Sequence, residues 1–399
     1  MNLDLKYIPI MKTLLSRFLN RGFILATIFF IFVFSCFYFK APGYNPFSAG
    51  YILFYSFFLI LSFVHSTKKV ERIFFLLALF FVLSFGIITD NTQRYFSVII
   101  LHLLPICIYL FFKVYCSKQF LVSFFYLLYY FALINIVVIL LPKLGIKINI
   151  GNQTPHGRSM GLFPNPNMLG VYLSFVFFFW ILLKRVVFSF NSILFVFNFL
   201  LFGSALWFSQ SRRSMFVFVL YIFYVLIKQQ KFQKLYLSAT IVIFTIGLSY
   251  FNLFEIAYDF INSLINLQVS DLSLSTRLLR SSQALDYVLS DPSYFLFGTW
   301  GEFGEIGSFF TNNDVFTALD VYPVLLISDV GFFGLLFMIW IYYNCSKTNF
   351  TDDEFLNTHN KAFLSSIVLT SLFGNTIVTF PIFLIIPLYM AYIKRTPCL

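Results

Sequence analysis

Three short segments of the sequence carry arginines in patterns that suit the binding of an anion. They span 155–167, 209–214 and 273–292. Their arginines are Arg158, Arg212, Arg213, Arg277 and Arg280. A guanidinium group presents a planar fork that binds phosphate or carboxylate at two points, and it stays charged when partly buried. The three segments therefore predict an anion site, with pairing to acidic side chains or to lipid phosphates as the open alternative.

Two of these segments lead into expected helices. Asn165 or Asn167 is expected to cap a helix that follows, and Arg212-Arg213 opens another. The free N–H groups and positive dipole end of a helix N-terminus attract anions. Two arginines at such an end oppose the dipole, so an anion is expected there. A turn that only caps its helix stays open as an alternative for 164–167.

The third segment predicts an amphipathic helix. Ser275 or Thr276 is expected to begin it, and Asp291-Pro292 to end it. At 100° per residue, one face holds Arg277, Arg280, Ala284 and Tyr287, and a neighbouring face holds Leu278, Leu285 and Leu289. Such a helix would lie on a membrane and present two arginines; a surface helix with solvated charges is the alternative.

The composition shows which elements must position these residues. Of 399 residues, 60% are hydrophobic and 11% charged, which excludes a soluble enzyme and a disordered chain. Apolar runs without strand alternation predict an all-α polytopic membrane protein. About twelve spans are expected, at 22–39, 47–64, 73–89, 96–115, 120–141, 167–183, 186–208, 214–227, 235–253, 323–343, 362–376 and 378–393.

The placement of basic residues predicts the orientation. With a cytoplasmic N-terminus, the inner segments hold 18 of the 27 lysines and arginines. This bias places both termini in the cytoplasm and explains the net charge of +11 without nucleic acid. The chain then divides into a cytoplasmic N-terminus (1–21), spans one to nine (22–253), a large extracytoplasmic loop (254–322), and the last three spans with the C-terminus (323–399). Outside, six arginines accompany three lysines, the reverse of the inner preference.

The other ionisable residues give less indication of a function. His102 lies inside the fourth span, where a core hydrogen bond is expected. The five cysteines form no CxxC motif, and no metal cluster or cofactor motif is visible. The spans hold almost no ionisable residues, Lys113 being the nearest, which argues against a transporter.

An ordered set of residues between 155 and 340 resembles the bacterial O-antigen polymerase and O-antigen ligase family. The set comprises Arg158-x-x-Gly161-x-Phe163-x-Asn165-Pro166-Asn167, Ser211-Arg212, Arg277 with Arg280, Asp291-Pro292 with Gly298-x-x-Gly301, and Asp329-Val330-Gly331-Phe332-Phe333-Gly334. The resemblance implies a metal-independent, multi-span glycosyltransferase of the bacterial cytoplasmic (inner) membrane. Its donor would be a polyprenyl-pyrophosphate-linked oligosaccharide, for the synthesis of O-antigen lipopolysaccharide, capsule or another surface polysaccharide, and a chain-length regulator would be a candidate partner.

The resemblance also assigns roles to residues. Arg212 and Arg277 would act on the pyrophosphate during catalysis, while Arg158, Asn167, Arg213 and Arg280 would bind it. Ligases of this family often carry a His-Asn pair where this chain has Asp320-Val321-Tyr322-Pro323, which favours polymerase over ligase. Asp320 is the expected general base, with His156 and Glu302 behind it, although it could instead only cap the tenth span. A lipid-linked oligosaccharide flippase is the rival from another class.

Overall fold

A computed structural model of the chain is almost wholly helical. Helices make up 89% of the residues that it describes, which confirms the all-α prediction for that part of the chain. The structure describes residues 21–38, 92–146, 152–153, 158–163, 165–187, 192–228, 272–299, 321–346, 354–372, 374 and 382–395. Of the expected spans, 47–64, 73–89 and 235–253 lie outside these residues.

The other nine expected spans each coincide with a helix. The helices are α2 (Arg21–Tyr38), α5 (Thr92–Val114), α6 (Lys118–Lys143), α7 (Pro166–Val187), α8 (Ser192–Ser209), α9 (Arg212–Lys228), α12 (Leu272–Ser290), α13 (Pro292–Phe297), α15 (Tyr322–Ser346), α16 (Glu354–Leu372) and α17 (Ile382–Arg395). Among the described residues, α6 and α7 have stretches long and apolar enough to cross a membrane, at Lys118–Lys143 and Pro166–Lys184. A short antiparallel pair, β1 (Asn152–Gln153) and β2 (Ser159–Gly161), precedes α7.

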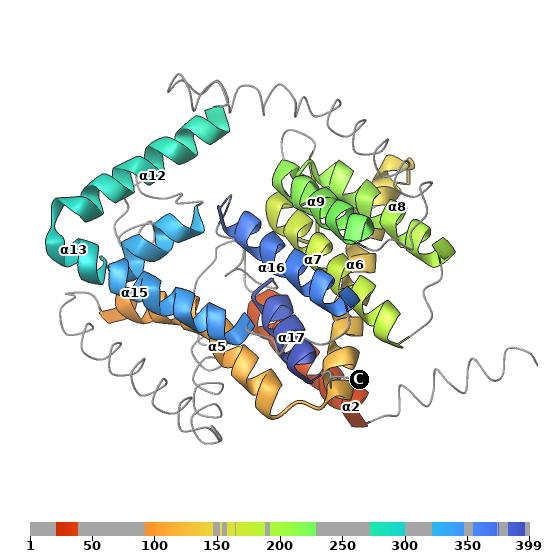
Figure 1. Cartoon of the computed structure of the whole chain (residues 1–399). Helices are drawn as coiled ribbons and strands as arrows, with labels where there is room; N and C mark the ends of the chain where they lie inside the picture. The colour runs from red at the N-terminus through yellow and green to blue at the C-terminus, as the bar shows by residue number, and fades with distance from the viewer. Residues whose placement is uncertain are drawn as a thin grey trace, which may run out of the picture.

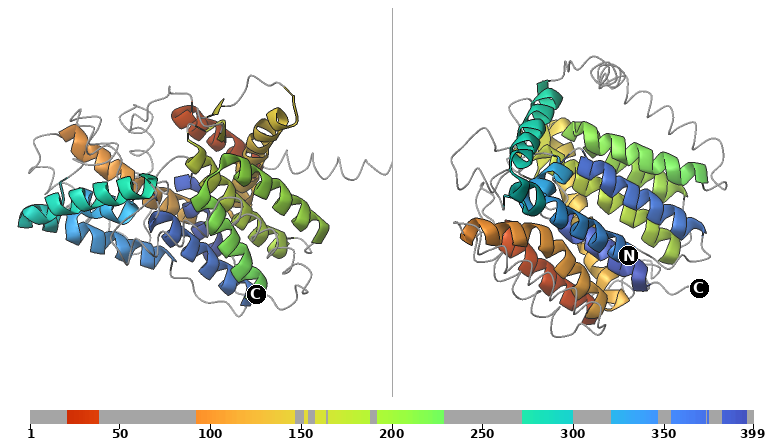
Figure 2. Two further views of the ribbon diagram at one scale, coloured as in Figure 1. Left: turned by 90° about the horizontal axis from the view of Figure 1, so that it is seen from above. Right: turned by 60° about the vertical axis from the view of Figure 1, so that its left-hand side comes forward.

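Helix α7 lies at the centre of the larger group of helices. It packs against α6, α8, α9, α16 and α17 (Figure 1). Its side chains are buried almost all round, including Tyr172, Phe175 and Phe177. A helix that is hydrophobic on every face requires such an enclosure. The rest is arranged around it: α2 packs on α6, α5 packs on α17, and α12 and α13 pack on α15 (Figure 2).

Several helix boundaries differ from those expected. Helix α7 continues to Val187, so α8 begins at Ser192 and not near residue 186. Helix α16 begins at Glu354, eight residues before the expected span, because its first turns, with His359, are buried in the bundle. The expected break between the last two spans is confirmed, since α16 ends at Leu372 and α17 begins at Ile382.

The two ends of the bundle hold the loops that the charge pattern assigns to opposite sides. At one end, the ammonium group of Lys143, in the last turn of α6, lies 5.6 Å from the centre of the Phe208 ring near the end of α8. At the other end, the ammonium group of Lys118 lies 5.5 Å from the centre of the Tyr392 ring in α17. Lys143 belongs to an expected outer segment and Lys118 to an inner one, and the orientation of these ends in a membrane stays a prediction.

Helix α15 is interrupted at Gly331, where a continuous span was expected. Gly331 has φ 70° and ψ −175°, which is not helical. A Cβ at Gly331 would meet the amide nitrogen of Gly298 and the carbonyl oxygen of Leu296. Gly298 itself has φ 82°, and a Cβ there would meet the carbonyl of Asp329. The backbone after α13 therefore rests directly on the backbone of α15, as two glycines allow.

Helix α12 matches its predicted C-terminus but not its predicted start. It ends at Ser290, and Asp291 then caps α13 by accepting hydrogen bonds from the hydroxyl and the amide of Ser293, which lower the pKa of the Asp291 carboxyl. It begins at Leu272, before the expected caps. Of its side chains from residue 279 onward, Ser281, Ala284 and Val288 are buried, whereas Leu289 is exposed. Helix α12 packs on α13 and α15.

We expect Gly331→Ala to destabilise the protein, because the alanine would need a left-handed conformation and would clash with the backbone around Gly298. The cost is expected to be about 2 kcal/mol or more. Thermal unfolding of the detergent-solubilised protein measures it as a fall in Tm. Gly203→Ala in α8 is the matched control, since no atom lies within 4 Å of the position that its Cβ would take, and it should leave Tm unchanged or raise it slightly. Equal Tm values for the two variants would contradict the close approach.

Candidate functional site

Arg158 joins three parts of the chain at one end of the bundle. Its Nε donates a hydrogen bond to the carbonyl oxygen of Ser209 at 3.3 Å, and its Nη2 donates to the carbonyl oxygen of Gln210 at 3.2 Å. Nη2 also donates to Oδ1 of Asn167 at 3.0 Å. Ser209 is the last residue of α8, where helix carbonyls lack helical partners and the dipole favours a cation. Arg158 thus ties the end of α8 to the first turn of α7.

The first turn of α7 resolves the two capping alternatives. Oδ1 of Asn165 accepts a hydrogen bond from the amide of Asn167 at 2.7 Å, and the helix begins at Pro166. Asn165 is therefore the cap, and Pro166 occupies the first helical position, where proline is favoured. The side chain of Asn167 is left to hold Arg158. The structure shows Asn167 bonded to Arg158, and its expected role in binding pyrophosphate stays a prediction.

Two close contacts hold together this corner of the bundle, which is formed by Arg158, the end of α8 and the first turn of α7. Gly161 has φ 58°, and a Cβ there would meet Oδ1 of Asn135, which accepts a hydrogen bond from the amide of Leu162 at 2.9 Å. Farther along α7, a Cβ at Gly170 would meet Ser211 and Ser214, whose hydroxyls are 2.7 Å apart. The first turns of α7 and α9 therefore lie against each other, and their positive ends are close together.

The adjacent residues Arg212 and Arg213 have different surroundings. Arg212 is exposed at the start of α9. Arg213 is partly buried, and its guanidinium group occupies the space that a Cβ on Gly374 would take, just after α16 ends. Arg213 lies where α16 ends, a position that favours a cation, and the expectation that both arginines bind an anion stays a prediction. The exposed guanidinium at this corner is that of Arg212.

The arginines of α12 lie on a separate element. In Figures 1 and 2, α12 lies apart from α9, with α13 at its far end and its first turns toward the bundle. Arg277 is in the second turn of α12, and Arg280, one turn later, is partly buried. The structure brings Arg158, Arg212 and Arg213 together at one corner and places Arg277 and Arg280 on another helix. The candidates for the base (Asp320, His156 and Glu302) lie outside the described residues.

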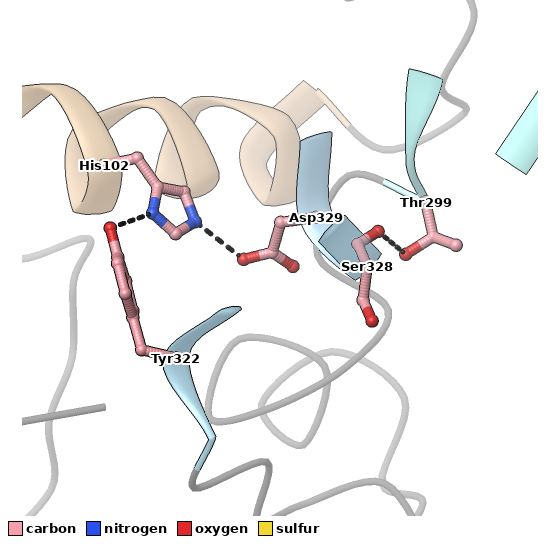
Figure 3. A network of polar contacts seen from close by, with 5 residues as sticks. All are labelled: His102, Thr299, Tyr322, Ser328 and Asp329. Carbon is pink, nitrogen blue, oxygen red and sulfur yellow. Dashed lines mark hydrogen bonds and ion pairs between the residues drawn. The ribbon is translucent and has the colours of Figure 1, made fainter. Parts of the chain in front are cut away.

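A buried polar network joins α5 and α15, and sequence reasoning found only part of it. Nε2 of His102 lies 2.9 Å from Oδ2 of Asp329, and Nδ1 lies 3.2 Å from the hydroxyl of Tyr322 (Figure 3). The expected hydrogen bond of His102 is confirmed. The statement that the spans hold almost no ionisable residues is wrong, because Asp329 and His102 are 0% and 2% exposed. The missed signal was an aspartate and a histidine within otherwise apolar runs, since such groups need each other.

Neither a candidate metal site among the described residues nor a match to a known family gives further support to a function of this site. Among the described residues, no three His, Cys, Asp or Glu side chains are grouped so that they could hold a metal ion. No protein-family model matches the chain, and no curated protein matches it. The resemblance noted in the sequence rests on its motifs alone.

We expect Arg158→Lys to destabilise this corner, because one ammonium group cannot reach the two carbonyls and Asn167 in the geometry of the guanidinium fork. The loss of one or two hydrogen bonds to a charged group is expected to cost about 1–3 kcal/mol, measured as a fall in Tm. Arg212→Lys is the control, since Arg212 is exposed and its replacement should leave Tm within error of the wild type. A stable Arg158→Lys variant would contradict the bridging role.

Proposed function

We propose that the chain is a polytopic protein of the bacterial cytoplasmic membrane that polymerises a surface polysaccharide. It would join oligosaccharide repeat units carried on polyprenyl pyrophosphate at the outer face, as O-antigen polymerases do. The proposed topology has about twelve spans, cytoplasmic termini and the extracytoplasmic loop at 254–322. The observation that carries the proposal is the corner where Arg158 ties α8 to α7 beside the exposed Arg212.

The electrostatics of this corner favour an anion. The positive ends of α7 and α9 lie together, and three guanidinium groups accompany them (Arg158, Arg212 and Arg213). Arg158 donates to the carbonyl oxygens of Ser209 and Gln210, which partly compensates its charge. Arg212 is exposed at the start of α9, and a guanidinium group beside two helix N-termini suits a diphosphate.

The reaction would be a displacement at the anomeric carbon by a sugar hydroxyl, with polyprenyl pyrophosphate as the leaving group. Negative charge grows on the leaving phosphate in the transition state. Donors held in place before the reaction stabilise such charge, by roughly 3–4 kcal/mol for each donor. Arg277 and Arg280 lie on α12 of the proposed outer loop, apart from α9, and are proposed to contact the same donor.

The buried pair of His102 and Asp329 is the observation that favours the alternative function, a transporter. Ionisable pairs inside membrane helices mark ion and proton pathways in transporters. The polymerase remains the better supported function, because the arginine corner lies at an end of the bundle, where a lipid-linked phosphate would meet it. A ligase differs only in its acceptor, and the missing His-Asn pair favours the polymerase.

Arg212→Ala and Arg277→Ala should each abolish chain growth without unfolding the protein. The substrate is the lipid-linked oligosaccharide extracted from cells that lack this chain, and it is incubated with the purified protein in proteoliposomes. Product length is read on gels, and removal of one donor is expected to lower turnover by about 100-fold or more. Lys361→Ala is the control, because Lys361 is an exposed cation of α16 on the predicted inner side.

The same experiment separates the alternatives. Long chains made by both arginine variants would refute the pyrophosphate role. Transfer of glycan to a lipid or protein acceptor without chain growth would identify a ligase, and movement of a fluorescent lipid-linked substrate across the bilayer without either would identify a flippase.

A further inference from the structure

The hydrogen bonds of His102 assign its tautomer. Asp329 is a carboxylate, which only accepts, so Nε2 of His102 carries the proton that it donates over 2.9 Å. In the neutral imidazole Nδ1 is then an acceptor, and the hydroxyl of Tyr322 donates to it over 3.2 Å. Carboxylate, imidazole and hydroxyl follow one another in a line, as Figure 3 shows. This order is the one in which an imidazole withdraws a proton from a hydroxyl while a carboxylate stabilises the imidazolium.

The network is held rigidly from the side of Asp329. The interruption of α15 at Gly331 takes the preceding carbonyls out of the regular helix pattern. The amide and the hydroxyl of Thr299 both donate to the carbonyl oxygen of Ser328, at 2.7 and 3.0 Å. Gly298 rests on the backbone of Asp329 beside them. A carboxylate fixed through its own backbone is suited to hold one imidazole orientation.

Stability alone does not explain why this ionisable pair is buried, so its presence points to a function. An ionisable pair enclosed among apolar helices contributes little net stability, and apolar side chains of similar size would serve the packing as well. Tyr322 is the first residue of α15 and follows the proposed outer loop directly, while His102 is ten residues into α5, about 15 Å along it. The backbone of Tyr322 thus adjoins the proposed outer loop, while its buried hydroxyl meets His102 within the bundle.

We propose that Tyr322 is the residue that takes the proton from the acceptor sugar, with His102 and Asp329 as positioning residues that act through it. This inference rests on the proposed polymerase function and supplies the base that it lacks. As the acceptor oxygen bonds to the anomeric carbon, its proton passes to the phenolic oxygen of Tyr322, whose own proton passes to Nδ1 of His102. The bond from the anomeric carbon to the pyrophosphate breaks, and its electron pair leaves with the pyrophosphate. The imidazolium paired with Asp329 later returns its proton through Tyr322 to water.

The chain contains a matched control for this network. In α16, Nδ1 of His359 lies 3.2 Å from the hydroxyl of Tyr389, the same distance as in the pair of His102 and Tyr322. Nε2 of His359 lies 2.8 Å from the carbonyl oxygen of Phe178, where His102 has a carboxylate. Tyr389→Phe removes a buried hydroxyl from a histidine just as Tyr322→Phe does, but it breaks no relay that includes a carboxylate.

The test measures kcat and KM for chain growth in proteoliposomes with the extracted lipid-linked oligosaccharide. Tyr322→Phe and Asp329→Asn should each lower kcat by about 100-fold with KM unchanged, since general base catalysis contributes at least this much. Tyr389→Phe should keep the wild-type kcat. In mixtures of H₂O and D₂O, kcat of the wild type should fall along a curve, because two protons move together, and kcat of Tyr322→Phe along a straight line.

Each outcome decides between the proposals. A Tyr322→Phe variant with wild-type kcat and a curved isotope response overturns the relay but not the polymerase, and so does an equal loss of kcat in Tyr389→Phe. A wild-type protein that joins no oligosaccharides overturns the polymerase and the relay with it. If Asp329→Asn fails to fold, as judged by gel filtration and Tm, Tyr322→Phe decides alone, because it removes one oxygen and leaves the hydrogen bond between His102 and Asp329 intact.

Discussion

The need to match every charge and every helix end inside an apolar bundle determines how this protein is arranged. Arg158 meets this need between α8 and α7, where its guanidinium group serves the carbonyl end of one helix and the first turn of the other. The guanidinium group of Arg213 lies beside Gly374, just after the end of α16. Arginines that sequence patterns assign to a ligand thus also hold helices together. This double use makes the corner rigid and leaves Arg212 as its exposed charge.

The same requirement explains the buried network. Asp329 and His102 lie on helices far apart in the sequence, and each would be costly alone. Together with Tyr322 they form a chain of hydrogen bonds that joins α5 to α15. His359 in α16 has different partners, because a backbone carbonyl oxygen and the hydroxyl of Tyr389 contact its two ring nitrogens. The presence of a carboxylate in only the first of these two networks is the reason to assign it chemistry.

The sequence predicted the helices better than their contacts. Hydrophobic runs and basic residues located nine helices, most of them to within a few residues of their ends, because long apolar stretches leave few other structures open. Asn165 and Pro166 marked the start of α7 through local chemistry alone. The bonds of Arg158 to the carbonyls of Ser209 and Gln210, and the approach of Arg213 to Gly374, could not be predicted, since these groups lie more than 50 residues away. The interruption at Gly331 also escaped prediction, because its cause is the approach of Gly298, which only the tertiary structure reveals.

The contact between Gly298 and Gly331 is made by main-chain atoms. A joint of this kind places few demands on sequence beyond the two glycines themselves. The neighbouring side chains of α12 and α13 can then be substituted while the segment keeps its backbone contact with α15. Under the proposed function, differences between glycan substrates would be accommodated by side chains of this segment, without a change in the backbone contact that anchors it.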